Sequence, residues 1–261
     1  MPDIDIEFLK IITIALISFS ASFLSFFSGF GLGTILLPVF AFFYELPIAI
    51  ALTGVVHFFN NLFKLALTYK SARIDIIVKF GLSSIAGALL GAFILQWANN
   101  NFNPIQIPYL NRSNEILKIT IGFLIIVFAT IEYSKNIISE NTQNNWLIPG
   151  GIISGFFGGL SGHQGALRTL FIQKIINDKN TFIATGIVIA CMVDIARIPI
   201  YLVNIKDVNL DYIILSISLI AAMAGALIGK SKSKNISEHS FKKLIYYCLL
   251  AIGIMMTLGF I

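Results

Sequence analysis

The stretch Gly155–Phe171, GFFGGLSGHQGALRTLF, places glycines, a histidine, a glutamine and an arginine inside one of the most apolar regions of the chain. Glycine adopts backbone conformations that other residues avoid, so the stretch predicts a break between two helices. In a membrane, unpaired backbone groups are tolerated only where protein or a cavity covers them. The break and its charge therefore indicate a buried functional element.

The rest of the chain is apolar enough to lie mostly within a lipid bilayer. Of its 261 residues 57% are hydrophobic and 12% are charged, which is typical of a polytopic membrane protein. The first residues lack a basic region and a cleavage site, so the first apolar segment is expected to be a retained span. Apolar windows of spanning length lie at 8–27, 46–69, 76–97, 115–134, 181–203, 209–230 and 241–261.

The chain contains an internal repeat. An offset of 133 residues aligns FLSFFSGFGLGTILLP (23–38) with FFGGLSGHQGALRTLF (156–171) without a gap. At the same offset Asn61 meets Asp194 and Lys64 meets Arg197, so polar residues recur in register inside apolar segments. At an offset that is five residues larger, AGALLG (86–91) matches AGALIG (224–229).

This duplication predicts an all-α membrane protein with two homologous halves. The first repeat covers residues 1–134, a connecting loop 135–146, and the second repeat 147–261. Each half is expected to contain a first helix, a glycine turn, a short helix (34–44 or 166–176) and three further spans. Discontinuous helices at corresponding positions of two halves are typical of a transporter's binding site.

The loop charges predict that the second half is inverted relative to the first. With an odd number of passes per half, one side collects eleven loop Lys and Arg residues and the other four, which fits the positive-inside rule. Both termini are then outside, and loops 70–79 and 230–243 are cytoplasmic. The larger set is Lys70, Arg73, Lys79, Lys135, Lys174, Lys179, Lys230, Lys232, Lys234, Lys242 and Lys243; the smaller is Lys10, Arg112, Lys118 and Lys206.

The two glycine turns are the first candidate substrate site. Backbone N–H groups at a helix start attract anions, and two inverted turns could face each other near the bilayer midplane. Close helix packing is the alternative role for these glycines. The candidate glycines are Gly29, Gly31, Gly33, Gly162 and Gly165.

Four side chains beside the turns could contact the same substrate. Arg168, one turn into the second short helix, is the strongest candidate for binding an anion. His163 and Gln164 occupy the turn itself, and His163 could contact substrate, carry a proton or serve only packing. Thr34 could offer a hydroxyl or bond back to its own helix.

A second group could line the pathway or couple a proton. Asn61 and Lys64 share one helix face, as do their counterparts Asp194 and Arg197. Charged residues within spans usually face the interior of the bundle. The alternatives are an Asp194–Arg197 ion pair, and snorkelling of Lys64 and Arg197 to the membrane surface. His57 shares the Asn61 face, but its counterpart is Ala190, so the repeat gives it little support.

Other functional classes lack sequence support. No basic stripe interleaved with aromatic residues indicates a nucleic-acid partner, and no nucleotide-binding or hydrolase motif is present. Cys191 and Cys248 show no metal-ligand spacing, so neither a metal nor a cofactor is expected. A membrane-embedded enzyme using His163, Asp194 and Arg168, and a non-transporting membrane subunit, remain the alternatives. A homo-oligomer is left open.

The glycine-rich segments FFSGFGLGTILLP and GFFGGLSGHQGALRTLF resemble the paired signatures of the sulfite exporter TauE/SafE family. The similarity extends over essentially the whole chain and includes the duplication. The usual triple glycine is reduced to Gly31-Leu32-Gly33 in one half and to His163-Gln164-Gly165-Ala166 in the other. The resemblance implies a secondary transporter of a small anion, often sulfite or an organosulfur acid, in the cytoplasmic membrane.

Overall fold

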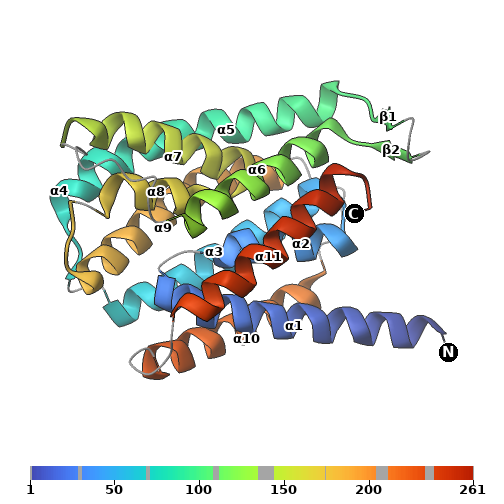
Figure 1. Ribbon diagram of the computed structural model, residues 1–261, viewed down its shortest axis with the longest axis horizontal. Coiled ribbons are helices and arrows are strands. Elements are labelled where there is room, and N and C mark those ends of the chain that lie inside the picture. Colours follow the sequence, from blue (N-terminus) through green and yellow to red (C-terminus); the bar gives the residue numbers. More distant parts are fainter. Residues whose placement is uncertain are drawn as a thin grey trace.

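A computed structural model describes residues 2–28, 31–68, 71–107, 112–134, 144–173, 175–203, 211–232 and 238–260 of the chain. The protein is a bundle of helices, shown in Figure 1. The first half comprises α1 (Pro2–Ser28), α2 (Leu32–Phe43), α3 (Leu46–Thr68), a span built from α4 (Ile74–Ile76), the π-helical η2 (Ile77–Gly81) and α5 (Leu82–Asn101), and α6 (Ile116–Tyr133). The second comprises the 3₁₀ turn η3 (Asn144–Trp146), α7 (Leu147–Ser161), α8 (Gln164–Ile172), α9 (Lys179–Val203), α10 (Tyr212–Lys232) and α11 (Glu238–Thr257).

The predicted all-α class is confirmed, and the order of elements is the same in the two halves. Within the described ranges, six helices are long and apolar enough to cross a membrane. A short antiparallel hairpin, β1 (Ile105–Ile107) and β2 (Arg112–Asn114), connects α5 to α6. Most of the predicted connecting loop lies outside the described residues.

The short helices begin earlier than the sequence suggests. The predicted starts follow Gly33 and Gly165, whereas α2 begins at Leu32 and α8 at Gln164. The backbone turns instead at Gly31 and Gly162, which have positive φ angles of 115° and 80°. A left-handed conformation is the one that only glycine adopts without strain, so these two glycines set the helix ends. α8 also ends at Ile172, four residues before the predicted end.

Equivalent helices of the two halves make equivalent packing contacts. The first helix of each half packs along the fourth span of the other half, α1 against α10 and α7 against α5. Both pairs run parallel: Gly87 lies against Ile152 and Gly91 against Phe156. In the other pair, Lys10 bonds Asp211 and Gly225 packs on Phe19. Gly87 and Gly225 occupy matching positions of the repeated AGAL segments.

Helices that correspond to each other meet in antiparallel pairs. On α3 and α9, Gly54 packs near Ile198 and Tyr201, and His57 contacts Asp194 one turn later. On α6 and α11, Gly122 lies near Thr257, while Tyr133 stacks on Tyr246 with ring centroids 4.5 Å apart. α3 and α9 thus cross at the middle of the bundle, beside the short helices.

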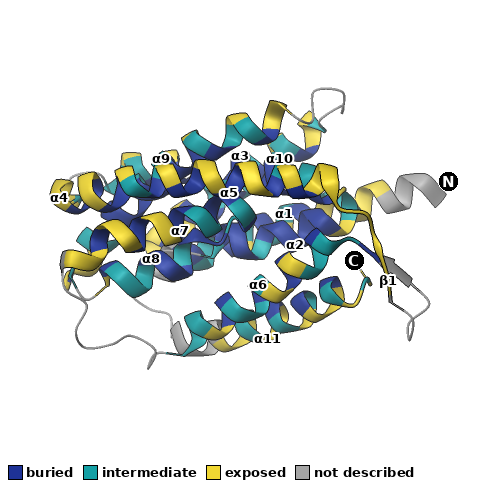
Figure 2. Ribbon diagram, turned by 90° about the horizontal axis from the view of Figure 1, so that it is seen from above, coloured by how far each residue is buried: buried dark blue, intermediate teal, exposed yellow. Residues whose placement is uncertain are grey.

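Most of the short helix α2 is buried, whereas the outer faces of the bundle are exposed and apolar. Figure 2 shows buried residues in the interior and exposed residues along the outside of α5, α6 and α7. Exposed residues on these faces include Phe93, Phe123 and Ile153. Such a surface suits contact with lipid, as expected for a membrane bundle.

Glycines hold α5 and α7 in close contact. A Cβ atom at Gly155 would lie 2.0 Å from the carbonyl oxygen of Ser84, and one at Gly159 would lie 2.1 Å from that of Ala88. These neighbours are backbone atoms, so no side chain can move aside to make room. The small-residue spacing Gly151, Gly155 and Gly159 therefore sets the separation of the two helices.

We expect Gly155→Ala to lower the free energy of unfolding by about 1–3 kcal/mol, because the added methyl group forces α5 and α7 apart. Thermal unfolding in detergent measures the change. Ile153→Ala is the matched control, since Ile153 lies on the same helix and is 40% exposed. Equal stability of Gly155→Ala and wild type would show that the two helices are not held at this contact.

Candidate functional site

The two helix breaks predicted from the repeat lie against each other. A Cβ atom at Gly33, in the first turn of α2, would be 3.5 Å from the carbonyl oxygen of Gly162 at the end of α7. The same position would be 3.6 Å from Cδ2 of His57 and 4.0 Å from Cγ2 of Thr53. The breaks therefore meet beside α3, in van der Waals contact with one another.

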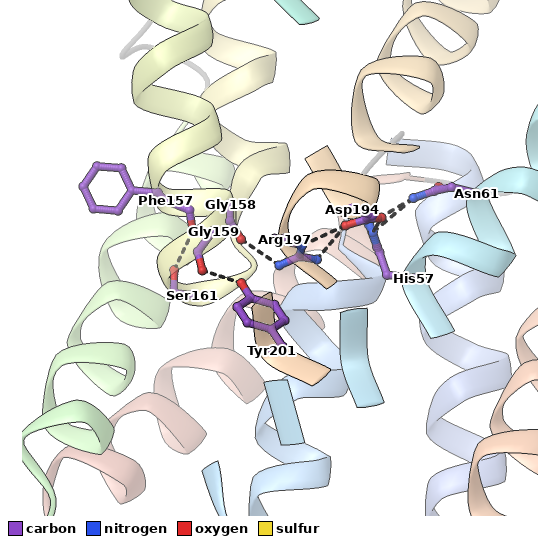
Figure 3. Close-up of polar contacts among 9 residues, drawn as sticks. All are labelled: His57, Asn61, Phe157, Gly158, Gly159, Ser161, Asp194, Arg197 and Tyr201. Carbon is purple, nitrogen blue, oxygen red and sulfur yellow. Dashed lines mark hydrogen bonds and ion pairs between the residues drawn. The ribbon is translucent and has the colours of Figure 1, made fainter. Parts of the chain in front are cut away.

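A network of charged groups crosses from α9 to α3 beside this junction, as Figure 3 shows. Arg197 Nε donates to Asp194 Oδ1 at 2.9 Å, and Nη2 lies 2.7 Å from the same oxygen. His57 Nδ1 lies 2.6 Å from Asp194 Oδ2, and the Asn61 amide lies 3.2 Å from both ring nitrogens of His57. The Asp194 side chain is fully buried, so this carboxylate balances the charge of Arg197.

Arg197 also anchors the broken end of α7. Its Nη1 donates to the Gly158 carbonyl at 2.6 Å, and the hydroxyl of Tyr201 donates to the Gly159 carbonyl. Carbonyl groups at a helix C-terminus lack partners within the helix and carry partial negative charge. Gly158 O also accepts from the Gly162 N–H at 3.0 Å, so Arg197 adds a second hydrogen bond there, and the Tyr201 hydroxyl bonds the next carbonyl of the helix end.

Lys64 makes the equivalent contact in the first half. Its Nζ donates to Ser25 Oγ at 2.6 Å and lies 3.5 Å from the Ser22 carbonyl on α1. At the offset of 133 residues, Lys64 corresponds to Arg197 and Ser25 to Gly158, so matched cations contact matched positions. Both cations are buried and have internal acceptors, so the alternative of snorkelling to the membrane surface does not apply. The Asp194–Arg197 ion pair, the other alternative to a pathway role, is present.

The second break carries buried polar atoms that have no hydrogen-bond partner among the described residues. They are Nε2 of His163 and both amide atoms of Gln164, in side chains that are 1% and 2% exposed. The Thr53 hydroxyl is a further such atom, on the α3 side of the junction. Buried polar groups are almost always paired, so a concentration of exceptions indicates a ligand or water site.

The contacts of His163 fix its hydrogen-bonding pattern. The Ser161 hydroxyl donates to the Phe157 carbonyl and so accepts from His163 Nδ1 at 3.1 Å. The ring also stacks on Phe128, with centroids 5.7 Å apart. In the neutral ring Nε2 is then an acceptor, and it becomes a donor only when the imidazole is charged.

The remaining predicted site residues lie at different distances from the junction. Arg168 is buried on α8 against Gly186 of α9, with Nε 3.2 Å from where a Cβ atom would lie. Gly186 precedes Asp194 by about two helical turns, roughly 12 Å along the helix axis. Thr34 is buried on α2 next to Gly33, and Gly165 lies in the first turn of α8. Gly29 lies outside the described residues.

A narrow pocket lies beside this network at one end of the bundle. It lies among the first turn of α3, the last turns of α5 and α9, and the first turn of α6. Tyr201, which bonds the end of α7, forms part of its wall. The other lining residues are Leu46, Pro47, Ile50, Leu95, Gln96, Asn99, Asn100, Leu117 and Ile200.

Three residues of this arrangement were missed or underrated by sequence analysis. His57 has no polar counterpart in the repeat, Thr53 reads as an ordinary apolar-helix residue, and Tyr201 lies beyond the quoted motifs. The spacing of His57 and Asn61 by four residues was the available signal, since it places both on one helix face. Among the residues that the structure describes, no group of three or more His, Cys, Asp or Glu side chains could hold a metal ion.

The chain matches a protein-family model over residues 14–256, which is nearly its full length. The model is that of the sulfite exporter TauE/SafE proteins. No curated protein and no solved structure matches the chain significantly.

We expect Asp194→Asn to lower the free energy of unfolding by about 3–5 kcal/mol, because it leaves the buried Arg197 without a compensating charge. The measurement is thermal or denaturant unfolding in detergent. Replacing both partners, Asp194→Leu with Arg197→Met, should recover part of the loss. The control is Asp75→Asn, which removes one partner of the exposed Arg73–Asp75 pair and should change stability little. A loss no larger than in that control would contradict the role of Asp194.

Proposed function

Since this chain belongs to the sulfite exporter TauE/SafE family, a family of membrane transporters, we propose that it moves a small anion across the cytoplasmic membrane. Sulfite and organosulfonates are the candidate substrates. The proposed site lies between the two glycine breaks and includes Gly31, Gly33, Gly162 and Gly165. The observation that carries this site is the buried group of polar atoms on His163 and Gln164, beside two helix ends that meet.

The buried charges favour an anion as the ligand. Among the described residues, the charged side chains that are buried are Lys64, Arg168, Arg197 and Asp194, three cations and one carboxylate. Burying excess positive charge is costly unless an opposite charge compensates it. The first N–H groups of α2 and α8 add further donors, since N-terminal amides have no partner within their own helix. Thr34 and Arg168 are proposed to complete the set.

The contacts of Arg197, Asp194 and Lys64 suggest a role for them beside the substrate. Arg197 bonds the end of α7 and Asp194 bonds Arg197, so their geometry favours positioning of the break over chemistry on a substrate. Because these contacts already occupy the two side chains, they support transport over the alternative of a membrane-embedded enzyme. Together with Asn61, these residues are proposed to line the pathway.

We propose that the halves are inverted in the membrane, as the loop charges predict. The antiparallel pairing of α3 with α9 and of α6 with α11 supports this arrangement, because corresponding helices of inverted halves must run in opposite directions. The pocket that Tyr201 lines lies at the end of the bundle proposed to face outside, so it offers a path from that side. Several of the loop residues on which the orientation rests are outside the described part of the chain: Lys70, Lys135, Lys174, Lys206 and Lys234.

The membrane potential would drive the export of an anion without a coupling ion. Moving one charge across the membrane contributes about 2.3 kcal/mol per 100 mV, and the potential of a cell favours anion exit. Uptake requires a co-transported cation, for which a proton on His163 or Asp194 is a candidate.

We expect one or more anions to stabilise the purified protein against heating, and Arg168→Ala to abolish the effect. At 100 times its dissociation constant, a ligand contributes about 2.7 kcal/mol to stability. The panel is sulfite, thiosulfate, sulfonates, sulfate and short carboxylates, with neutral solutes for comparison.

Lys79→Ala is the matched control for the loss of a positive charge, because Lys79 is exposed on η2. Arg168→Lys keeps the charge and should retain part of the stabilisation. A well-folded protein that no anion stabilises would overturn the anion site and direct attention to cations or neutral solutes.

Cysteine labelling in intact cells tests the orientation. In a variant without Cys191 and Cys248, we expect Asn99→Cys to react with a membrane-impermeant maleimide added outside, because Asn99 lines the outer pocket. Arg73→Cys should react only after the cells are opened, since residue 73 is proposed to be cytoplasmic. The opposite pattern would reverse the orientation.

A further inference from the structure

We propose that His57 carries a proton that is transported together with the anion. This inference rests on the proposed anion site and names the residue that couples it to a proton gradient. The sequence gives His57 little weight because its repeat position is Ala190. The structure gives it contacts to both the charge network and the glycine junction.

The His57 ring joins the two halves at the buried carboxylate. Its Nδ1 lies 2.6 Å from Asp194 Oδ2, a short contact in which Nδ1–H donates to the carboxylate. The other oxygen of Asp194 accepts from Arg197, so the carboxylate is held between two cationic or potentially cationic groups. With Nδ1 engaged, Nε2 is the position at which His57 gains or loses a proton.

Asn61 packs over the His57 ring. The amide lies one turn along α3, with Nδ2 3.2 Å from both ring nitrogens of His57. A point equally distant from both nitrogens lies over the face of the ring. The Asn61 amide therefore does not occupy the Nε2 lone pair, which lies in the ring plane.

The location of His57 allows its charge to act on the substrate. Cδ2 of His57 lies against Gly33, next to the Gly162 carbonyl, where the two breaks meet. With neutral His57, the charges of Arg197 and Asp194 cancel within the network. With His57 charged, the network has an excess of one positive charge at the proposed anion site.

His57 is also the most exposed of the three charged or titratable members of the network. Its side chain is 13% exposed, whereas those of Asp194 and Arg197 are 0% and 1% exposed. Proton uptake forms the Nε2–H bond as an O–H bond of a hydronium ion breaks, and release on the other side of the membrane reverses this exchange. The anion and the proton thus enter and leave the site together.

Other charged or titratable groups around α3 are few. α9 presents Asp194 and Arg197, and α3 itself carries Lys64 two turns away. α1 between residues 11 and 28, α2, and α10 between residues 213 and 229 contain no charged or histidine residue. The break after α7 adds His163, and α8 adds Arg168.

The test is the pH dependence of anion binding in wild type, His57→Gln and His163→Gln. Methanesulfonate and sulfate serve as probes because they stay ionised between about pH 5 and 8, the range in which histidine changes charge. In wild type we expect the apparent affinity, from the anion-induced shift in melting temperature, to fall about tenfold or more from the acidic to the basic end. His57→Gln keeps a donor for Asp194 and should bind with little pH dependence. A wild-type slope that survives in His57→Gln would overturn the proposal.

His163→Gln distinguishes proton coupling from direct contact with the anion. This variant should bind the anion more weakly, while the pH dependence of its anion binding remains.

A second measurement needs no anion: ¹⁵N NMR of histidine-labelled protein, with the His57 signal assigned by its loss in His57→Gln. We expect the nitrogen shifts of His57 to reveal both the neutral and the charged ring as the pH is varied. A single protonation state at every pH would refute the proton carrier. Failure of every anion to bind, with normal His57 titration, would instead refute the anion site and leave the proton carrier standing.

Discussion

The structure depends on the requirement that every backbone group exposed by a helix break inside a membrane must find a partner. Glycines at 31 and 162 interrupt the first helix of each half, and the interruption leaves carbonyl and amide groups without helical neighbours. At the end of α7 the partners come from Arg197 and Tyr201 of α9. A buried arginine in turn requires Asp194, and Asp194 brings in His57 from α3. The charge network is thus the consequence of the broken helix.

The sequence predicts the bundle well because both signals that define it can be read without knowing how the helices pack. Apolar windows locate the spans, and polar residues repeated at a fixed offset reveal the two halves. It also identifies Gly31, Gly162 and His163 at the breaks. It does not place Arg197 beside the break or find the internal partner of Lys64, for which it leaves a reach to the membrane surface open. The acceptor Ser25 comes from a helix 39 residues earlier, and only packing brings the two together.

His57 and Tyr201 show a second limit of the repeat as a guide. Duplicated halves retain matched contacts, as Lys64 with Ser25 and Arg197 with Gly158 demonstrate. The partners differ chemically, since α1 offers a serine hydroxyl where α7 offers a bare carbonyl. His57 sits where the second half has alanine, so its importance follows from its contact with the opposite half. Residues that act across the junction need no counterpart and escape any argument from internal symmetry.

The parallel packing of α1 on α10 has a consequence for how the protein is made. Phe19 leaves the ribosome long before Gly225, so the first helix must wait in the membrane for its partner through most of synthesis. Asn60 and Lys64 form a polar face of α3 that α1 and α10 enclose. Until α10 is in place, these polar side chains need other hydrogen-bond partners. The exchange of first helices also means that neither half encloses its own core.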